Sequence, residues 1–283
     1  MSAPLYGLVL TGGRSTRMGE DKAALRIGGR TQLERAMALV APHVERAFVS
    51  VRPDQRDDPL RAGFEQIADT RVDLGPIAGI LAAQERFPDK AWLVLACDLP
   101  LLDAATLAFL LRKRAPRRLA TAFRSSHDGL PEPLCAVYEP ASRPHLLAYV
   151  DRGRQCPRKF LMGADVELLE EPQPHALDNA NTPEEHATAV NVLEQSNATA
   201  AAAARRLTVQ YYAVLREQAG RREESLVSCA RTAHELYREL AQRHPFSLDP
   251  TVLRVAINGE FGDWTAPLKD GDSVVFIPPV AGG

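Results

Sequence analysis

A segment rich in glycine and basic residues follows the first apolar run of the sequence. It reads LTGGRSTRMGEDK and spans Leu10–Lys22. Glycines let backbone N–H groups approach an anion closely, and basic side chains neutralise phosphate charge. We therefore expect the glycine backbone, at Gly12 and Gly13, to bind a polyphosphate together with the basic residues Arg14, Arg17 and Lys22; the alternative is a surface turn with incidental arginines. The segment lacks the GK[ST] ending of a Walker loop and the GxGxxG spacing of dinucleotide folds.

A second candidate for chemistry is Asp98, which directly follows the strongest buried-strand pattern, Trp92–Cys97 (WLVLAC). Magnesium typically binds one or two protein carboxylates and keeps several waters. One aspartate at the end of a strand therefore suffices to hold Mg²⁺ against phosphates, although a turn cap before Pro100 is the structural alternative. Cys97 is interpreted as a small buried hydrophobe. His43 and His127 are interpreted as non-catalytic, because neither has a partner at a useful spacing in the sequence.

Alternating strand and helix patterns surround these residues. Apolar runs predict strands at Leu5–Leu10, Ala47–Val51 and Trp92–Cys97, and helical spacing predicts helices at Thr31–Val40, Ile77–Phe87 and Ala104–Arg114. Thr182, Pro183 and Glu185 have the spacing of a capping box that begins another helix. The alternation predicts an α/β domain with a mostly parallel, Rossmann-like sheet and helices on both faces. Ligands of such sheets bind beyond the carboxyl ends of the strands, where Lys22 and Asp98 are expected.

The last part of the chain has a different pattern. Strands are predicted at Leu207–Val214, Glu224–Ser228, Arg254–Ile257 and Ser273–Ile277, with one helix at Thr232–His244. This order predicts a small α+β domain whose sheet wraps around a single helix. The preceding residues 196–205 (SNATAAAARR) are rich in alanine and form either a mobile linker or the solvated end of a helix. The predicted domains are 1–195 and 206–283, in line with about 150 residues per domain.

Composition excludes several classes of protein. Lys+Arg 34 against Asp+Glu 36 gives a net charge of −2, so a broad nucleic-acid surface is not expected. The four cysteines have no CxxC spacing, which favours a reduced, cytoplasmic protein over a disulfide framework. No signal-peptide pattern occurs, and no run approaches the roughly 18 apolar residues of a membrane span.

The glycine-rich segment, as LxGGRSxRMGxDK, resembles the molybdenum cofactor guanylyltransferases among the glycosyltransferase-A-type nucleotidyltransferases. These enzymes transfer a nucleoside monophosphate from an NTP to an acceptor, here molybdopterin, and release pyrophosphate. The GGRS pattern resembles the guanylyl branch more than the cytidylyl branch, which more often has AAGxSxRMG. Thr11 stands where the family usually has alanine. A cytidylyl- or sugar-nucleotidyltransferase remains the alternative within this class.

Three further segments support the resemblance: GPIAGI at Gly75–Ile80, CDLP at Cys97–Pro100 and NANTP at Asn179–Pro183. The resemblance implies that GTP contacts Leu10, Thr11, Gly12, Gly13, Lys22, Asp69 and Asp98. It implies a catalytic role for Lys22, Arg17 and Asp98, with Mg²⁺ on Asp98, and an acceptor-side role for Asn179 and Asn181. Asp73 competes with Asp69 for the same assignment. Arg52 stands where the family often has asparagine, so no contact is assigned to it.

The C-terminal part resembles the small subunit of molybdopterin synthase at Tyr212–Gly220 (YAVLREQAG), Lys269–Asp272 (KDGD) and the final PPVAGG. This resemblance implies a ubiquitin-like β-grasp fold in which Gly283 is adenylated and converted to a thiocarboxylate that supplies sulfur. The implied partners are a sulfur-carrier adenylating enzyme and the large subunit of molybdopterin synthase. The alternatives are a β-grasp interaction module without chemistry, or a carrier whose degenerate nucleotide domain is a scaffold.

Overall fold

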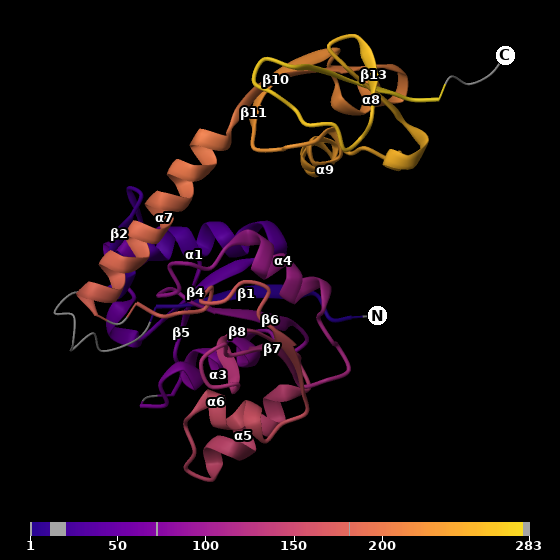
Figure 1. The fold of residues 1–283 in the computed structure, drawn as a ribbon. Helices are drawn as coiled ribbons and strands as arrows, with labels where there is room; N and C mark the ends of the chain where they lie inside the picture. The colour runs from indigo at the N-terminus through magenta and orange to yellow at the C-terminus, as the bar shows by residue number, and fades with distance from the viewer. Residues whose placement is uncertain (1, 12–20, 72, 181, 280–283) are drawn as a thin grey trace. The chain divides into compact units, whose positions relative to one another are not determined.

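The computed structural model describes residues 2–11, 21–71, 73–180 and 182–279. The predicted site residues Gly12, Gly13, Arg17, Asn181 and Gly283 lie outside these ranges. The chain divides into two compact units, Met1–Leu193 and Glu194–Gly283. Helix α7 (Pro183–Ala203) runs across the boundary between them (Figure 1). Residues 196–203 therefore continue this helix, in keeping with the high helix propensity of alanine.

A seven-stranded sheet forms the centre of the first unit. Its strands lie in the order β5 (Gln66–Ala68), β4 (Ala47–Val51), β1 (Leu5–Leu10), β6 (Ala91–Ala96), β8 (Pro131–Tyr138), β7 (Ala120–Arg124) and β9 (Val166–Glu170). The first four strands are parallel, and so is the pair β7–β9. Strand β8 is antiparallel to β7, to which a short loop joins it as a hairpin, and it is also antiparallel to β6. The prediction of a mostly parallel sheet is thus confirmed.

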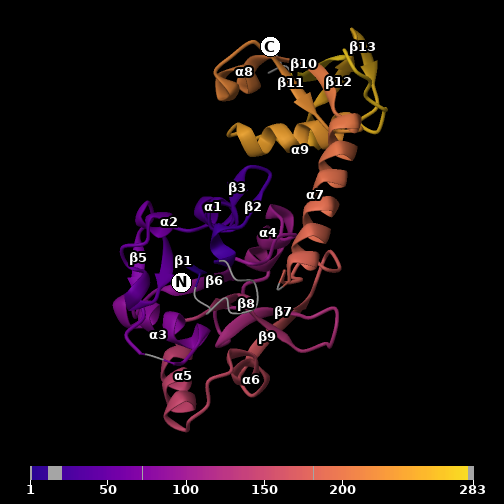
Figure 2. The ribbon, with the colours of Figure 1, turned by 90° about the vertical axis from the view of Figure 1, so that its left-hand side faces the viewer.

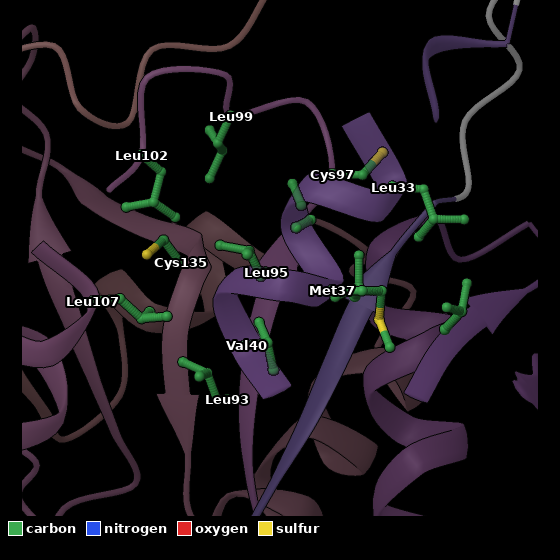
Figure 3. Close-up of a cluster of buried hydrophobic side chains, with 14 of the residues drawn as sticks. Leu33, Met37, Val40, Leu93, Leu95, Cys97, Leu99, Leu102, Leu107 and Cys135 are labelled. Carbon is green, nitrogen blue, oxygen red and sulfur yellow. The ribbon is translucent and has the colours of Figure 1, made fainter. Parts of the chain in front are cut away.

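Helices cover both faces of this sheet (Figures 1 and 2). Helices α1 (Gln32–Val40) and α4 (Ala104–Arg112) lie on one face, and α3 (Pro76–Arg86), α5 (Ser142–Asp151) and α6 (Pro157–Met162) on the other. Leu93 and Leu95 pack with Met37 on the first face (Figure 3). Trp92 and Val94 pack on the second face. Successive side chains of a strand point to opposite faces, so the continuous apolar run of β6 fills both cores.

The remaining elements of this unit are short. They are the strands β2 (Arg26–Ile27) and β3 (Arg30–Thr31), the helix α2 (Pro59–Ala62), and the 3₁₀ helices η1 (Lys22–Ala24), η2 (Ala41–His43) and η3 (Pro53–Gln55). Among the described residues, no helix of either unit is long and apolar enough to cross a membrane.

The second unit has a mixed five-stranded sheet. Its order is β11 (Glu223–Ser228), β10 (Arg205–Tyr211), β14 (Ser273–Ile277), β12 (Arg254–Ile257) and β13 (Glu260–Gly262). β10 and β14 are parallel, and the other pairs are antiparallel. Helix α9 (Ala233–Arg243) packs Leu236, Tyr237 and Leu240 into the core of this sheet. The short 3₁₀ helix η4 (Pro250–Val252) precedes β12. This is the expected β-grasp arrangement.

One predicted strand of the second unit was too long. Leu207–Val214 was expected to be extended, but β10 ends at Tyr211 and helix α8 (Ala213–Ala219) follows. Gly220 ends that helix in the left-handed conformation, with φ 67°. The apolar residues of α8, among them the buried Leu215, continue the apolar pattern of the strand, so the pattern alone did not show where the strand ends.

Candidate active site

The carboxyl ends of the parallel strands bring together polar residues that are distant in sequence. Thr11 follows β1, Asp69 follows β5, and Asp98 comes two residues after β6. β1 and β6 are neighbours in the sheet, and β4 lies between β1 and β5. All four strands are parallel, so the residues that follow them lie along one edge. The predicted nucleotide-binding residues of the described chain are thus on the edge where such folds bind ligands.

Lys22 and Asp98 form an ion pair at this edge. The distance from Lys22 Nζ to Asp98 Oδ2 is 3.1 Å, and the two side chains are 22% and 16% exposed. Lys22 begins the helix η1, which Asp21 caps by accepting a hydrogen bond from the Ala23 N–H at 3.0 Å. A cation and a carboxylate that remain open to solvent can each exchange their partner for a ligand, the lysine for phosphate and the aspartate for a metal ion.

Arg61 connects this pair to the end of β1, and no sequence motif indicated it. Its side chain is fully buried. Nε donates to Thr11 Oγ1 at 3.0 Å, and Nη2 donates to the Thr11 carbonyl at 3.3 Å and to Asp21 Oδ2 at 2.6 Å. Asp58 accepts another hydrogen bond from the same guanidinium. A planar guanidinium can serve several acceptors at once, so Arg61 connects Thr11 to the residue that precedes Lys22.

Asp69 lies in a partly buried position on the same edge. Ser50 Oγ donates to Asp69 Oδ1 at 3.2 Å, and the Ser50 carbonyl accepts from Thr11 Oγ1 at 2.8 Å. Burial raises the pKa of Asp69 to about 6, although the hydrogen bond from Ser50 opposes this shift. The competing Asp73 is exposed and has a positive φ of 57°. Of the two competing aspartates, Asp69 is therefore the one that hydrogen bonds connect to Ser50 and Thr11 at this edge.

Two glycines of the GPIAGI segment allow helix α3 to approach the site. Gly75 caps the helix with φ 57° and ψ −143°, a conformation that other residues rarely adopt. A Cβ atom at Gly79 would lie 2.3 Å from Ser50 Oγ and 2.9 Å from Leu10 Cδ2. Only glycine lets the helix pack this closely on β1 and β4, and this contact supports Ser50 beside Asp69.

The segment around Asn179 is also held against Asp98. The Ala180 N–H donates to the Asp98 carbonyl at 3.2 Å. The expected capping box follows, with the Thr182 N–H 3.1 Å from Glu185 Oε2 and the Glu185 N–H 3.2 Å from Thr182 Oγ1. Asn179 therefore lies one residue from a direct contact with Asp98.

Arg52, to which the sequence assigned no nucleotide contact, forms an ion pair with Asp54, with Nε 3.0 Å from Oδ1.

A cavity of about 650 Å³ opens beside this segment, and its lining includes Leu99, Pro100, Glu132, Asp178 and Asn179. His127 also lines it, and its Nε2 lies 2.6 Å from Asp178 Oδ1. The interpretation of His127 as a histidine without a partner was therefore wrong, because the partner is 51 residues away in sequence. Cys97 is buried as expected, and burial raises the pKa of its thiol far above the usual value.

Comparisons with known proteins agree with this geometry. A family model described as a MobA-like NTP transferase domain matches residues 7–170, and a ThiS family model matches residues 209–283. A molybdenum cofactor biosynthesis bifunctional protein of Synechocystis is 34% identical over 183 residues, which are 65% of this chain and 53% of that protein. The chain thus spans about half the length of this relative.

Two further matches concern the first unit. The molybdenum cofactor guanylyltransferase of Shewanella halifaxensis is 30% identical over 189 residues, which cover 65% of this chain and 93% of that enzyme. The crystal structure of molybdopterin-guanine dinucleotide biosynthesis protein A from Archaeoglobus fulgidus has a TM-score of 0.57 at 23% identity, and covers 67% of this chain and 99% of its own. This likeness shows a shared fold. The chain therefore belongs to the MobA-like NTP transferase family, as a nucleotidyltransferase that also carries a ThiS-family domain.

Proposed function

We propose that the first unit transfers GMP from GTP to the phosphate of molybdenum-bound molybdopterin and releases pyrophosphate. The observation that carries this proposal is the 3.1 Å pair of Lys22 and Asp98, held beside the Asn179 segment by the Ala180–Asp98 hydrogen bond. The guanylyltransferase relatives support the choice of nucleotide and acceptor. Asp69 and Thr11 are proposed to lie on the nucleotide side, and Asn179 on the acceptor side.

The reaction requires positioning and charge neutralisation more than proton transfer. A phosphate monoester has a second pKa of about 6, so the acceptor is largely ionised near neutral pH and needs no general base. Its oxygen forms a bond to the α-phosphorus of GTP while the bond to the β-phosphate oxygen breaks and pyrophosphate leaves. The Lys22 ammonium is placed to neutralise phosphate charge that develops on the leaving group.

The residues at this edge fit a magnesium ion. Asp98 supplies a carboxylate that is partly open to solvent, and magnesium commonly takes one or two carboxylates with water and substrate phosphates as its other ligands. Mg²⁺, when bound, supplies positive charge against the phosphates. Asp21 is less suited as a second ligand, because it already pairs with the buried Arg61. Asp98 is therefore the proposed magnesium ligand.

Pyrophosphate release with GTP, CTP or ATP, with and without molybdopterin and Mg²⁺, tests this proposal. We expect release with GTP that depends on both the acceptor and Mg²⁺. A preference for CTP, or transfer to a sugar phosphate, would contradict the guanylyltransferase proposal and favour a cytidylyl- or sugar-nucleotidyltransferase. Absence of release with every nucleotide and acceptor would indicate a scaffold with a degenerate nucleotide domain.

We further propose that the second unit is a sulfur carrier for molybdopterin synthesis, with Gly283 as the activated residue. The match to the ThiS family extends to residue 283, and strand β14 leads from the centre of the sheet to Pro278 and Pro279. In the proposed reaction, a carboxylate oxygen attacks ATP, pyrophosphate leaves, and sulfide then displaces AMP. The proposed partners are an adenylating enzyme and the large subunit of molybdopterin synthase.

Mass spectrometry of the C-terminal peptide tests the carrier role. After incubation with an adenylating enzyme, ATP and sulfide, we expect replacement of one oxygen by sulfur at Gly283. A C-terminal peptide of unchanged mass, from a preparation in which a known carrier is converted, would contradict the proposal.

A further inference from the structure

Two imidazoles and a carboxylate converge beside the cavity, and none of the three residues belongs to the Lys22–Asp98 pair. His127 comes from the loop between β7 and β8, and His175 and Asp178 come from the segment between β9 and α7. Each oxygen of Asp178 contacts one ring, His127 Nε2 at 2.6 Å and His175 Nδ1 at 2.9 Å. One ligand atom from each of the three residues lies within 4.8 Å of the others. We call these three residues the histidine cluster.

The surroundings of the histidine cluster carry excess negative charge. Burial, together with the negative charges of Glu132 and Asp178, raises the pKa of Glu171. Its Oε2 is buried without a hydrogen-bond partner among the described residues. The guanidinium of Arg158 forms ion pairs with two other carboxylates: Nη1 lies 2.8 Å from Asp128 Oδ2, and Nη2 lies 2.8 Å from Glu132 Oε1. Within the described ranges, no lysine or arginine forms an ion pair with Asp178 or Glu171, so a cation at the cluster would be favoured electrostatically.

The ligand types select the class of cation. Imidazole nitrogen suits zinc, cobalt, nickel and copper, whereas magnesium prefers oxygen ligands. Zinc binds histidine nitrogen and carboxylate oxygen at about 2.0–2.2 Å, which places tetrahedral ligand atoms about 3.4 Å apart. The ligand atoms of the histidine cluster are spread over as much as 4.8 Å. The two histidine side chains are 60% and 62% exposed, so small rotations can bring their nitrogens closer together.

We propose that His127, His175 and Asp178 bind a divalent transition-metal ion of the zinc class, at a site separate from the magnesium site at Asp98. His127 and Asp178 also line the cavity that contains Asn179. Three protein ligands leave at least one coordination position for water or for a donor atom of a molecule in the cavity.

Cobalt(II) titration of the full chain, followed by visible absorption, tests this site. Excess Mg²⁺ is present throughout to occupy the oxygen-ligand site, and zinc is added last as a competitor. We expect one cobalt ion per chain, with the intense d–d bands of four or five coordination, and complete displacement by zinc. The Asp98→Ala variant should bind cobalt unchanged, which separates this test from that of the proposed transferase function.

Three single variants address the ligands: His127→Ala, His175→Asn and Asp178→Asn. His175 has a positive φ of 69°, and asparagine tolerates this conformation, so His175→Asn removes the imidazole with little strain on the backbone. Each variant should weaken cobalt binding by at least about 100-fold, because loss of a direct ligand should cost no less than the roughly 10–100-fold that loss of an outer-shell partner costs. His145→Ala is the matched control, because His145 is an exposed histidine of α5 outside the cluster.

Circular dichroism of each variant verifies that it is folded. Equal cobalt affinity in the three ligand variants and His145→Ala would overturn the proposal. A cobalt–thiolate charge-transfer band would do the same, because it would assign the ion to an exposed cysteine, Cys156 or Cys229. In either case, His127, His175 and Asp178 would form a hydrogen-bonded surface network without a metal.

Discussion

The two units place their proposed chemistry in opposite ways. In the first unit, Thr11, Asp69 and Asp98 follow parallel strands of one sheet, and Lys22 Nζ lies 3.1 Å from Asp98 Oδ2. In the second, the central strand β14 is followed by Pro278 and Pro279, on the way to the proposed reactive residue Gly283. The first fold brings reactive groups together at a sheet edge, whereas the second is proposed to offer a chain segment to other enzymes. The proposed chemistry of the first unit therefore depends on internal geometry, whereas the proposed carrier role of the second depends on recognition by other proteins.

Buried polar groups show the same contrast. The fully buried Arg61 joins Thr11 and Asp21 beside the candidate active site. In the second unit, Glu224 accepts a hydrogen bond from the hydroxyl of Tyr211 and lies 2.8 Å from His244 Nε2. This contact joins β10, β11 and the end of α9. Charged hydrogen bonds therefore order a site in one unit and join secondary-structure elements in the other.

Loss of the Asp98 carboxylate should have the largest effect. Asp98→Ala is expected to reduce Mg²⁺-dependent pyrophosphate release by at least about 10³-fold, because the variant lacks the proposed metal ligand beside Lys22. The assay is pyrophosphate release with GTP and molybdopterin. Sulfur loading of Gly283 should be unchanged. Near-wild-type turnover would contradict the metal assignment.

A single alanine added after Gly283 should have the opposite pattern of effects, on the second unit and not on the first. Thiocarboxylate formation should disappear, since the reactive carboxylate would then belong to another residue, and GTP-dependent pyrophosphate release should stay at the wild-type level. Mass spectrometry and the pyrophosphate assay measure the two activities in one preparation. The same alanine added before Met1 is the control. Sulfur loading of the extended protein would show that the tail does not carry the chemistry.

Replacement of the buried arginine tests how far the site depends on internal geometry. Arg61→Leu should lower the free energy of unfolding of the first unit by about 2–4 kcal/mol, because Asp21 and Asp58 lose their partner and Thr11 loses two hydrogen bonds. Thermal unfolding followed by calorimetry measures the loss. Arg56→Leu, at an exposed position nearby, should cost less than about 0.5 kcal/mol. Equal losses of unfolding free energy in the two variants would show that the buried Arg61 does not stabilise the site.

The smallest predicted effect concerns Asp69 and pH. Its pKa of about 6 lies above the usual value of 3.8, so the carboxylate becomes protonated as the pH falls through 6, loses its negative charge and accepts a hydrogen bond from the nucleotide much more weakly. GTP affinity should therefore fall about tenfold per pH unit below 6, in addition to the titration of the GTP phosphates. Asp69→Asn should show only the phosphate titration. If GTP affinity changed with pH in the same way in the wild type and in Asp69→Asn, Asp69 would be excluded from nucleotide binding.

Much of the fold could be predicted because its signals are local. The predicted strands at Leu5–Leu10 and Ala47–Val51 match β1 and β4 residue for residue, and β6 is shifted by one. Strands buried on both faces are continuous apolar runs, which a short window detects. Strand β10 was misjudged at its end, because the apolar residues of α8 extended the same pattern.

The sequence alone determined which residues carry reactive groups, and the tertiary structure decided which of them meet. Glycines, Lys22 and Asp98 could be identified from residue type and from their positions after apolar runs. Arg61 contacts Thr11 across 50 residues and Asp21 across 40, and His127 meets Asp178 across 51. Such contacts have no characteristic spacing in the chain, since they depend on how strands are ordered in the sheet and how loops pack at its edge. Side-chain partners at these distances are set by the packing of the whole unit.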